Sequence, residues 1–303
     1  MNYRQLGKDG ADIPIIGLGA WPIGGGMGNM DDRDSIDTVR TAIDSGITLL
    51  DTAQAYRTSE ATLGRALKDG YRERCFLATK VSRQYSRGDI ESAIENSLRN
   101  LDVDYVDLYQ IHSWNPQYPI EESMETMARL QEQGKTRFIG VSNFNAAQMQ
   151  QAYDIAPFHS NQPRYNMFDR SIEAEDLDFC RQTGIGILAH SPLGKGLLTG
   201  KYAPGHVFSE GDERAGSPRF QGDLFARYLA VADELQSVAA DKNMTMVQLA
   251  IAWLLRREEV TCVLVGAKNS DQVKEHVGAA DVAFSDDELE RIEKILQHTP
   301  SGF

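Results

Sequence analysis

Two short stretches share one pattern, Cys75-Phe76-Leu77-Ala78-Thr79-Lys80 and Tyr105-Val106-Asp107-Leu108-Tyr109-Gln110-Ile111-His112. In each, apolar residues run on with little strict alternation until a polar residue is reached. Such runs are typical of strands that are buried on both faces of a parallel sheet. Four further runs of this kind occur, at Ile47–Leu50, Phe138–Val141, Ile185–Ala189 and Val260–Val265.

The spacing of the polar residues that end these runs indicates the number of strands. They are separated by 20 to 32 residues, the length of one strand and one helix: Asp51, Lys80, His112, Ser142, Gln162 and His190. Adding Gly17–Ala20 and Val260–Val265 gives eight strands. Apolar residues at helical spacing lie between them, as at Ile90, Ile94 and Leu98.

Eight strand–helix units predict an α/β fold, a (β/α)₈ TIM barrel that occupies residues 1–303 as one domain. An open doubly wound sheet is the weaker alternative. The segments 4–6 and 13–15, joined by a turn at Lys8-Asp9-Gly10, predict an N-terminal β-hairpin. Asp89 and Asn145 are expected in the first turns of helices, and Gly134 and Gly184 at helix ends.

Composition excludes several classes of protein. The chain has 31 Lys and Arg against 44 Asp and Glu, a net charge of −13, and no basic cluster that would bind nucleic acid. No apolar run approaches the roughly 18 residues that span a membrane, and the N-terminus lacks the apolar core of a signal peptide. Cys75, Cys180 and Cys262 show no CxxC spacing, so no metal site is expected. We expect a cytoplasmic protein without membrane or nucleic-acid partners.

Asp51, Tyr56, Lys80 and His112 form a candidate catalytic set, because strand ends converge on one face of a barrel. Taken singly, each also has an ordinary structural role, such as capping a turn or packing in the core. Together they would suit proton donation by Tyr56 to a carbonyl oxygen, with His112 orienting that oxygen. Donation near neutrality requires the tyrosine pKa to fall by about 3 units, or about 4 kcal/mol. The ammonium of Lys80, at about 4 Å from the phenol, would contribute about 4 kcal/mol at an effective dielectric of about 20. Asp51 would hold that ammonium in place.

Five motifs resemble the aldo-keto reductase superfamily in order and spacing, from about Tyr3 to about Gln297. They are Leu50-Asp51-Thr52-Ala53, Tyr56, Ala78-Thr79-Lys80, Gln110-Ile111-His112 and Gly140-Val141-Ser142-Asn143-Phe144. The resemblance implies a single barrel that binds a nicotinamide dinucleotide without a Rossmann domain. It also implies that Tyr56 is the acid, that Lys80 and Asp51 tune it, and that His112 orients the carbonyl.

The same resemblance assigns positions to the cofactor. Ser142, Asn143 and Gln162 match residues that bind the carboxamide, and His190 stands where an aromatic ring often stacks on the nicotinamide. The pyrophosphate loop would comprise Ser191, Leu193, Gly194, Gly196 and Leu197. Gly24–Gly28, in contrast, is read as a flexible loop, because no helix opens directly on it.

The adenosine-phosphate segment would comprise Gly266, Lys268, Asn269, Gln272 and His276. Lys268 is the candidate partner of a 2′-phosphate, near the N-terminus of a helix. Gln272 stands where Arg is frequent in the family, and His276 where Asn is frequent. The resemblance therefore implies NADP as the cofactor, preferred only modestly, with NAD still usable.

The substrate is expected to be a small aldehyde, ketone or sugar. Trp21 and Trp114 would form the walls of the pocket mouth, and residues 202–222 are expected to be a long loop on the same face. The tail after the last helix, 298–303, is shorter than the loop that closes steroid-type pockets in the family, which favours an open pocket. Reduction of such a carbonyl compound is the leading function.

A regulatory subunit of the potassium-channel β-subunit type is the alternative, since such subunits share the barrel and the site. The absence of an N-terminal extension before the hairpin favours the enzyme. A cofactor-free barrel lyase is a more distant third reading.

Overall fold

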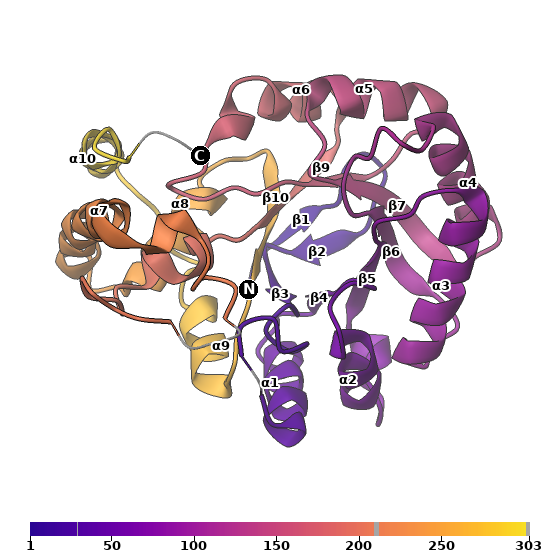
Figure 1. The fold of residues 1–303 in the computed structure, drawn as a ribbon, viewed down its shortest axis with the longest axis horizontal. Coiled ribbons are helices and arrows are strands. Elements are labelled where there is room, and N and C mark those ends of the chain that lie inside the picture. Colours follow the sequence, from indigo (N-terminus) through magenta and orange to yellow (C-terminus); the bar gives the residue numbers. More distant parts are fainter. Residues whose placement is uncertain (29, 209–211, 301–303) are drawn as a thin grey trace.

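The computed structural model describes residues 1–28, 30–208 and 212–300. Its centre is a closed barrel of eight parallel strands in the order β10-β3-β4-β5-β6-β7-β8-β9 (Figure 1). The strands are β3 Ile16–Gly19, β4 Leu49–Asp51, β5 Phe76–Val81, β6 Val106–Ile111, β7 Thr136–Ser142, β8 Ser160–Gln162, β9 Gly186–His190 and β10 Val260–Val265. The predicted TIM barrel is confirmed.

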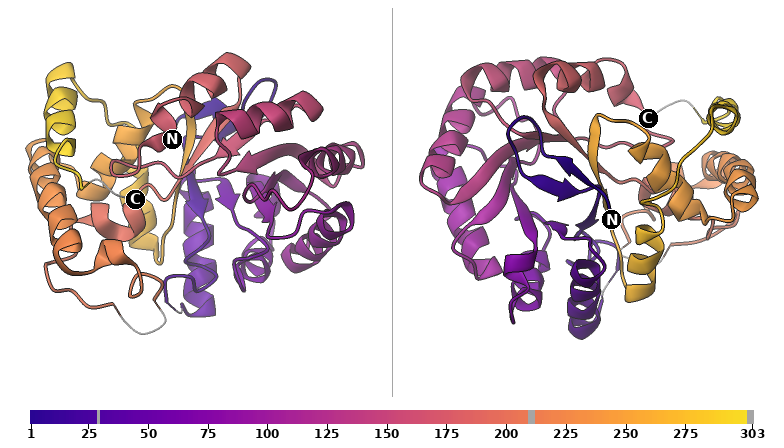
Figure 2. Two further views of the ribbon diagram at one scale, coloured as in Figure 1. Left: turned by 45° about the horizontal axis from the view of Figure 1, so that its top comes forward. Right: turned by 180° about the vertical axis from the view of Figure 1, so that it is seen from behind.

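Helices surround the barrel, as Figures 1 and 2 show. They are α1 Asp32–Asp44, α2 Ser59–Ala66, α3 Arg87–Leu101, α4 Ile120–Glu132, α5 Ala146–Ile155, α6 Asp176–Thr183, α7 Gly222–Asp241, α8 Met246–Leu255, α9 Ser270–Val277 and α10 Asp286–Leu296. Short 3₁₀ segments occupy Arg72–Arg74, Ser171–Glu173, Gly194–Thr199 and Pro218–Phe220. Helix α8 is apolar on almost every side because it packs between β10 and α7.

The N-terminal hairpin closes the end of the barrel at which the strands begin. Strand β1 (Tyr3–Gln5) pairs antiparallel with β2 (Asp12–Pro14), as predicted, and the hairpin crosses the barrel in the right view of Figure 2. Leu6 and Ile13 are fully buried in the cluster that fills the barrel interior. Arg4 donates hydrogen bonds to the carbonyl groups of Arg257 and Leu255, at 3.0 and 2.9 Å.

Local signals at the helix ends were largely correct. Asn145 caps α5, its side chain accepting from the backbone N–H of Gln148 at 2.9 Å. Gly184 ends α6 in the left-handed conformation, with φ 74°. Asp89 lies in the first turn of α3, as expected, and Ser86 is the capping residue.

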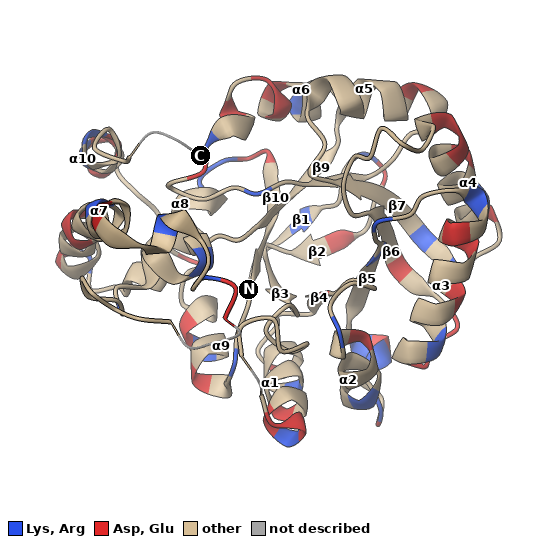
Figure 3. Cartoon of the chain, in the orientation of Figure 1, with Lys and Arg blue, Asp and Glu red and all other residues tan. Residues whose placement is uncertain are grey.

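Charged residues are spread over the outer helices with both signs interspersed (Figure 3). Within residues 1–28, 30–208 and 212–300, no helix is both long and apolar enough to cross a membrane. The expected loop 202–222 contains a 3₁₀ turn at Pro218–Phe220 and leads directly into α7. Its residues 209–211, and residues 301–303 of the tail, lie outside the described residues.

Candidate active site

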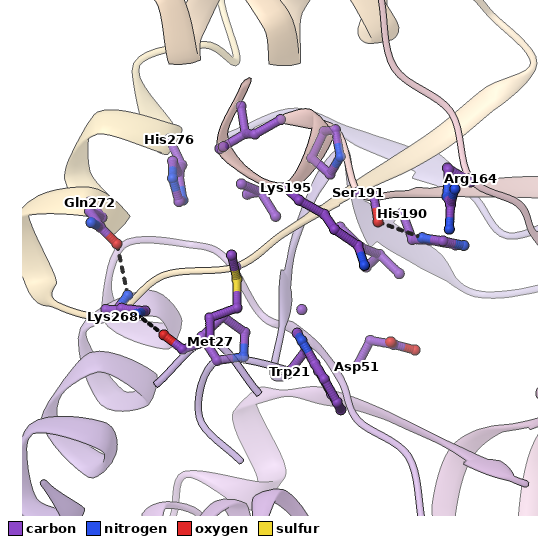
Figure 4. A pocket seen from close by; sticks show the side chains of 18 of the residues that line it. Trp21, Met27, Asp51, Arg164, His190, Ser191, Lys195, Lys268, Gln272 and His276 are labelled. Atoms are coloured by element: carbon purple, nitrogen blue, oxygen red, sulfur yellow. Dashed lines mark hydrogen bonds between the residues drawn. The ribbon is translucent and has the colours of Figure 1, made fainter. Parts of the chain in front are cut away.

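A cavity of about 530 Å³ opens at the ends of the barrel strands. In Figure 4, Lys268, Gln272 and His276 line one side, and Asp51, His190 and Arg164 the other. Most of the predicted site residues line it: Trp21, Asp51, Tyr56, His112, Ser142, Asn143, Gln162, His190, Ser191, Leu193, Gly196, Gly266, Lys268, Gln272 and His276. The predicted residues outside the lining are Lys80, Gly194, Leu197, Asn269 and Trp114.

Lys80 and Asp51 form a buried ion pair beneath the cavity. Lys80 is 0% exposed; its Nζ lies 2.5 Å from Asp51 Oδ1 and donates to the carbonyl oxygen of Thr52 at 2.8 Å. The adjacent parallel strands β4 and β5 hold the two residues. Burial lowers the pKa of Lys80, but the charges and hydrogen bonds of Asp51 and Tyr56 together raise it by more, so the net shift is upward. Lys80 therefore stays charged at neutral pH.

Two glutamines hold the second oxygen of Asp51. Gln162 Nε2 donates to Asp51 Oδ2 at 2.8 Å, and Gln110 Nε2 donates to it at 3.2 Å. Gln162 was expected to serve only the carboxamide, and Gln110 had no predicted role. The sequence held a signal for Gln110, because it lies near the end of β6, two residues before His112, and side chains two apart in an extended segment face the same way.

Tyr56 follows β4, and its ring contacts three neighbouring side chains. Lys80 Nζ lies 5.0 Å from the ring centroid, and the rings of Trp21 and His112 approach edge-on at 5.0 and 5.6 Å. Burial raises the pKa of Tyr56 by more than Lys80 lowers it, so the net shift is upward. The expectation of a lowered pKa is wrong, because it counted the attraction of Lys80 and omitted the loss of water around the phenol.

His112 is held uncharged beside Tyr56. Burial and the nearby charge of Lys80 lower the pKa of His112 to about 3. The Oγ of Ser82 lies 2.7 Å from His112 Nδ1, a contact that sequence reasoning missed. A neutral imidazole carries one N–H, so this ring can donate a single hydrogen bond.

A chain of side chains links His112 to the predicted cofactor loop. Asn143 Nδ2 donates to the carbonyl oxygen of His112 at 3.1 Å and to Ser142 Oγ at 3.0 Å. Asn143 Oδ1 lies 2.9 Å from His190 Nε2, and His190 Nδ1 lies 2.9 Å from Ser191 Oγ. Desolvation and the charge of Arg164 lower the pKa of His190 to about 3, so this ring is also neutral.

The predicted phosphate loop turns through left-handed backbone positions. Ser191, Gly194, Lys195 and Gly196 have φ values of 57°, 55°, 56° and 104°. A Cβ at Gly196 would lie 2.9 Å from the ring of Tyr202, so glycine is required there. Gly194 and Leu197 support this loop from outside the cavity lining.

Cations gather along the side of the cavity that Lys268 lines. Lys268 Nζ donates to the carbonyl oxygen of Met27. Burial lowers the pKa of Lys268, and the charges of Arg214 and Lys201 lower it further. Lys201 lines the cavity, whereas Arg214 is held by Asp212 at 2.6 Å. Lys201 and Arg214 were missed, because one lies just before the loop 202–222 and the other within it, where no family motif occurs.

The segment after Lys268 is held mainly by local hydrogen bonds. Gln272 Oε1 accepts from the backbone N–H of Lys268 at 2.8 Å (Figure 4). Asn269 caps α9 and accepts from the N–H of Gln272 at 2.9 Å. His276 is 2% exposed, its Nδ1 has no partner among the described residues, and burial lowers its pKa to about 4.

The two predicted tryptophans lie in different places. Trp21 lines the cavity and packs on Gly26, where a Cβ would lie 2.0 Å from the indole. Trp114 instead lines a separate small hollow with Tyr85 and Tyr118, and its ring meets that of Phe144 at 5.2 Å. Within the described chain, no group of three His, Cys, Asp or Glu side chains could hold a metal ion.

A profile of the Aldo/keto reductase family matches residues 15–297, and the chain belongs to that family of enzymes. It is 38% identical to the Aldo-keto reductase YhdN of Bacillus subtilis (strain 168), over 99% of this chain and 95% of that protein. It is 30% identical to the L-glyceraldehyde 3-phosphate reductase of Escherichia coli O157:H7, over 100% of this chain and 93% of that one.

Among solved structures, the chain is similar to the glycerol dehydrogenase AKR11B4 from Gluconobacter oxydans. The two superpose with a TM-score of 0.89 at 33% identity, covering 99% of this chain and 97% of the other. The family is typically dependent on NAD(P)H.

Proposed function

We propose that this protein reduces a small aldehyde, ketone or sugar to an alcohol with NADPH, and that Tyr56 is the general acid. The observation that carries the proposal is the buried pair of Lys80 and Asp51 beneath the face of Tyr56. A fully buried ammonium that is held by a carboxylate and placed against a phenol has no evident structural purpose. It does serve a reaction in which that phenol gives up a proton.

The residues around the cavity fit a nicotinamide dinucleotide. The cavity volume of about 530 Å³ lies in the range of cofactor sites. Cations on one side suit phosphate groups, and the unpartnered Nδ1 of His276 suits a hydrogen-bonding base. When bound, the reduced cofactor supplies the hydride that attacks the carbonyl carbon. Ser142, Asn143 and Gln162 would hold the carboxamide, and Ser191–Leu197 the pyrophosphate.

Tyr56 supplies the proton that completes the alcohol. Its raised pKa means that the hydroxyl is fully protonated at neutral pH and available for donation. The charge of Lys80 stabilises the tyrosinate left after transfer, and Asp51 keeps Lys80 charged and in place. His112, neutral at that pH, positions the carbonyl oxygen next to the phenol.

The preference for NADPH rests on surplus positive charge. Lys268 and Lys201 both line the cavity, and the like charges of Arg214 and Lys201 add to the burial that lowers the pKa of Lys268. A 2′-phosphate with close to two negative charges would relieve that repulsion. Lys268 is therefore proposed as its main partner and Lys201 as a second one.

Small hydroxylated carbonyl compounds are the proposed substrate class. One relative is named for glyceraldehyde 3-phosphate and one similar structure for glycerol, both short polyols or their oxidised forms. In this chain Trp21 and Tyr56 shape the cavity beside the proposed reaction centre. A cytoplasmic location with no membrane or nucleic-acid partner remains part of the proposal.

The test is a panel of small aldehydes, ketones and sugars with NADPH and NADH in parallel, following the absorbance of the reduced cofactor. We expect turnover of several short aldehydes, faster with NADPH at low cofactor concentration. Fluorescence titration with each cofactor runs beside it. Tight cofactor binding without turnover of any carbonyl would favour a regulatory subunit, and absence of dinucleotide binding would overturn the proposal.

A further inference from the structure

Two histidine rings face the cavity, and each has a serine hydroxyl on its Nδ1. Ser82 Oγ lies 2.7 Å from Nδ1 of His112, and Ser191 Oγ lies 2.9 Å from Nδ1 of His190. We propose that Ser82 is a positioning residue: its hydroxyl donates to His112 Nδ1, which keeps the ring proton on Nε2 and presents that N–H to the substrate oxygen. The inference rests on the proposed function of His112.

His190 shows which atom donates in such a histidine–serine pair, because the partner of its other ring nitrogen can only accept a hydrogen bond. His190 Nε2 lies 2.9 Å from Asn143 Oδ1. The amide nitrogen of Asn143 is occupied with two acceptors, the carbonyl of His112 and Ser142 Oγ, so Oδ1 must accept. His190 therefore carries its proton on Nε2, and its Nδ1 accepts from the hydroxyl of Ser191.

The same arrangement at His112 has a chemical consequence. The ring is neutral and carries one proton, which either nitrogen can hold in the absence of a partner. A proton on Nδ1 would point at Ser82 and leave a lone pair on Nε2 facing a carbonyl oxygen, which is repulsive. When the hydroxyl of Ser82 donates to Nδ1, that nitrogen carries no proton. The ring proton is then on Nε2, where it can be donated to the substrate oxygen.

The backbone places the two residues opposite each other without help from loops. Ser82 directly follows β5, and His112 directly follows β6, where Val81 pairs with Ile111 in the parallel register. The backbone N–H of His112 donates to Val81 at 3.1 Å, and that of Ser82 donates to Gln54 Oε1 at 3.2 Å. Ser82 and His112 thus occupy the next pair of positions after Val81 and Ile111, at the ends of two neighbouring strands.

The direct test is nitrogen NMR of the histidine rings in the full chain, with His112 assigned by a His112→Gln variant. We expect the wild-type ring of His112 to be protonated on Nε2, and the Ser82→Ala ring to show a mixture of tautomers. Wild-type signals that place the proton on Nδ1 would overturn the inference. This measurement does not depend on turnover, so it stands apart from the test of the proposed function.

Kinetics supply the second readout. Ser82→Ala should lower kcat roughly 3- to 10-fold, the effect of one neutral hydrogen bond, with NADPH affinity unchanged. Ser82→Thr, which keeps the hydroxyl, should restore both kcat and the ring signals. Ser113→Ala is the matched control, because its hydroxyl is next to His112 in sequence but lies 3.2 Å from Tyr85 Oη. Equal losses in Ser82→Ala and Ser113→Ala, or no loss in Ser82→Ala with unchanged ring signals, would contradict the inference.

Discussion

Lys80 and Lys268 lie in two regions of one site and have pKa values shifted in opposite directions. The pKa of Lys80 is raised despite complete burial, because Asp51, which lies 2.5 Å away, and Tyr56 both favour the charged form. The pKa of Lys268 is lowered, because it is partly buried and its charged neighbours Arg214 and Lys201 repel it. Lys80 has its counterion within the protein, whereas Lys268 has room for one that a ligand would bring.

The difference extends to the way each region is built. Around Lys80, partners come from strand ends across the barrel, as the two glutamines on Asp51 show. Around Lys268, partners come from loops and backbone carbonyls such as that of Met27. A region built from strands is preformed for chemistry. The region around Lys268, which is built from loops and has excess positive charge, is suited to binding an anion.

Removing the proposed acid should produce the largest effect. Tyr56→Phe keeps the ring but deletes the hydroxyl, and we expect kcat to fall by about 10²- to 10⁴-fold, the usual contribution of a general acid. NADPH affinity, measured by fluorescence titration, should stay within about twofold, since phosphate contacts lie elsewhere. Near wild-type turnover of a good substrate would show that another group supplies the proton.

Breaking the buried pair should cost stability as well as rate. Lys80→Met leaves the Asp51 carboxylate buried without a cation, and we expect the free energy of unfolding to fall by about 3–5 kcal/mol. The double variant Asp51→Asn, Lys80→Met should recover most of that loss in denaturant titrations. Its kcat should stay low, because no charge stabilises the tyrosinate. Recovery of activity in the double variant would show that Lys80 is purely structural.

His276 offers a test based on acid stability. Its pKa of about 4 lies below the usual 6.5, so the fold gains stability from it above pH 6.5 and loses that stability as the pH falls towards 4. At pH 5 this loss is about 2 kcal/mol. In His276→Asn, the drop in stability between pH 7 and pH 5 should shrink by about that amount. His298→Gln, at an exposed position, is the control for replacing a histidine as such.

Lys268→Ala should have the smallest of these effects. One charge-assisted contact to a phosphate corresponds to about a 10-fold loss of NADPH affinity, because Lys201 would still contribute. NADH affinity should change little. Lys274→Ala on α9, the helix that follows Lys268, is the matched control, because Lys274 is paired with Asp271 at 3.7 Å on the exposed surface. Equal losses for both cofactors would place the 2′-phosphate elsewhere.

Much of the fold could be predicted from local signals. A buried strand has to be continuously apolar and the residue at its end can be polar, so the run before Lys80 and the run before His112 marked two strands directly. Six such ends and two further apolar runs made up the eight strands of the barrel, and the family motifs indicated the proposed catalytic set. Asp89 indicated the first turn of α3, but the capping residue Ser86 was not identified, because several polar residues near a helix start compete for the capping role.

The pKa of Tyr56, the clamp of Gln110 and Gln162 on Asp51, and the contact of Ser82 with His112 could not be obtained in this way. Each depends on which strands become neighbours and on how much water the closed barrel excludes. Residue types and spacings are properties of a local segment, so they indicate the positions at which polar side chains lie. Desolvation and contacts across the barrel exist only after the eighth strand has paired with the first, and they set the strength of each acid and base.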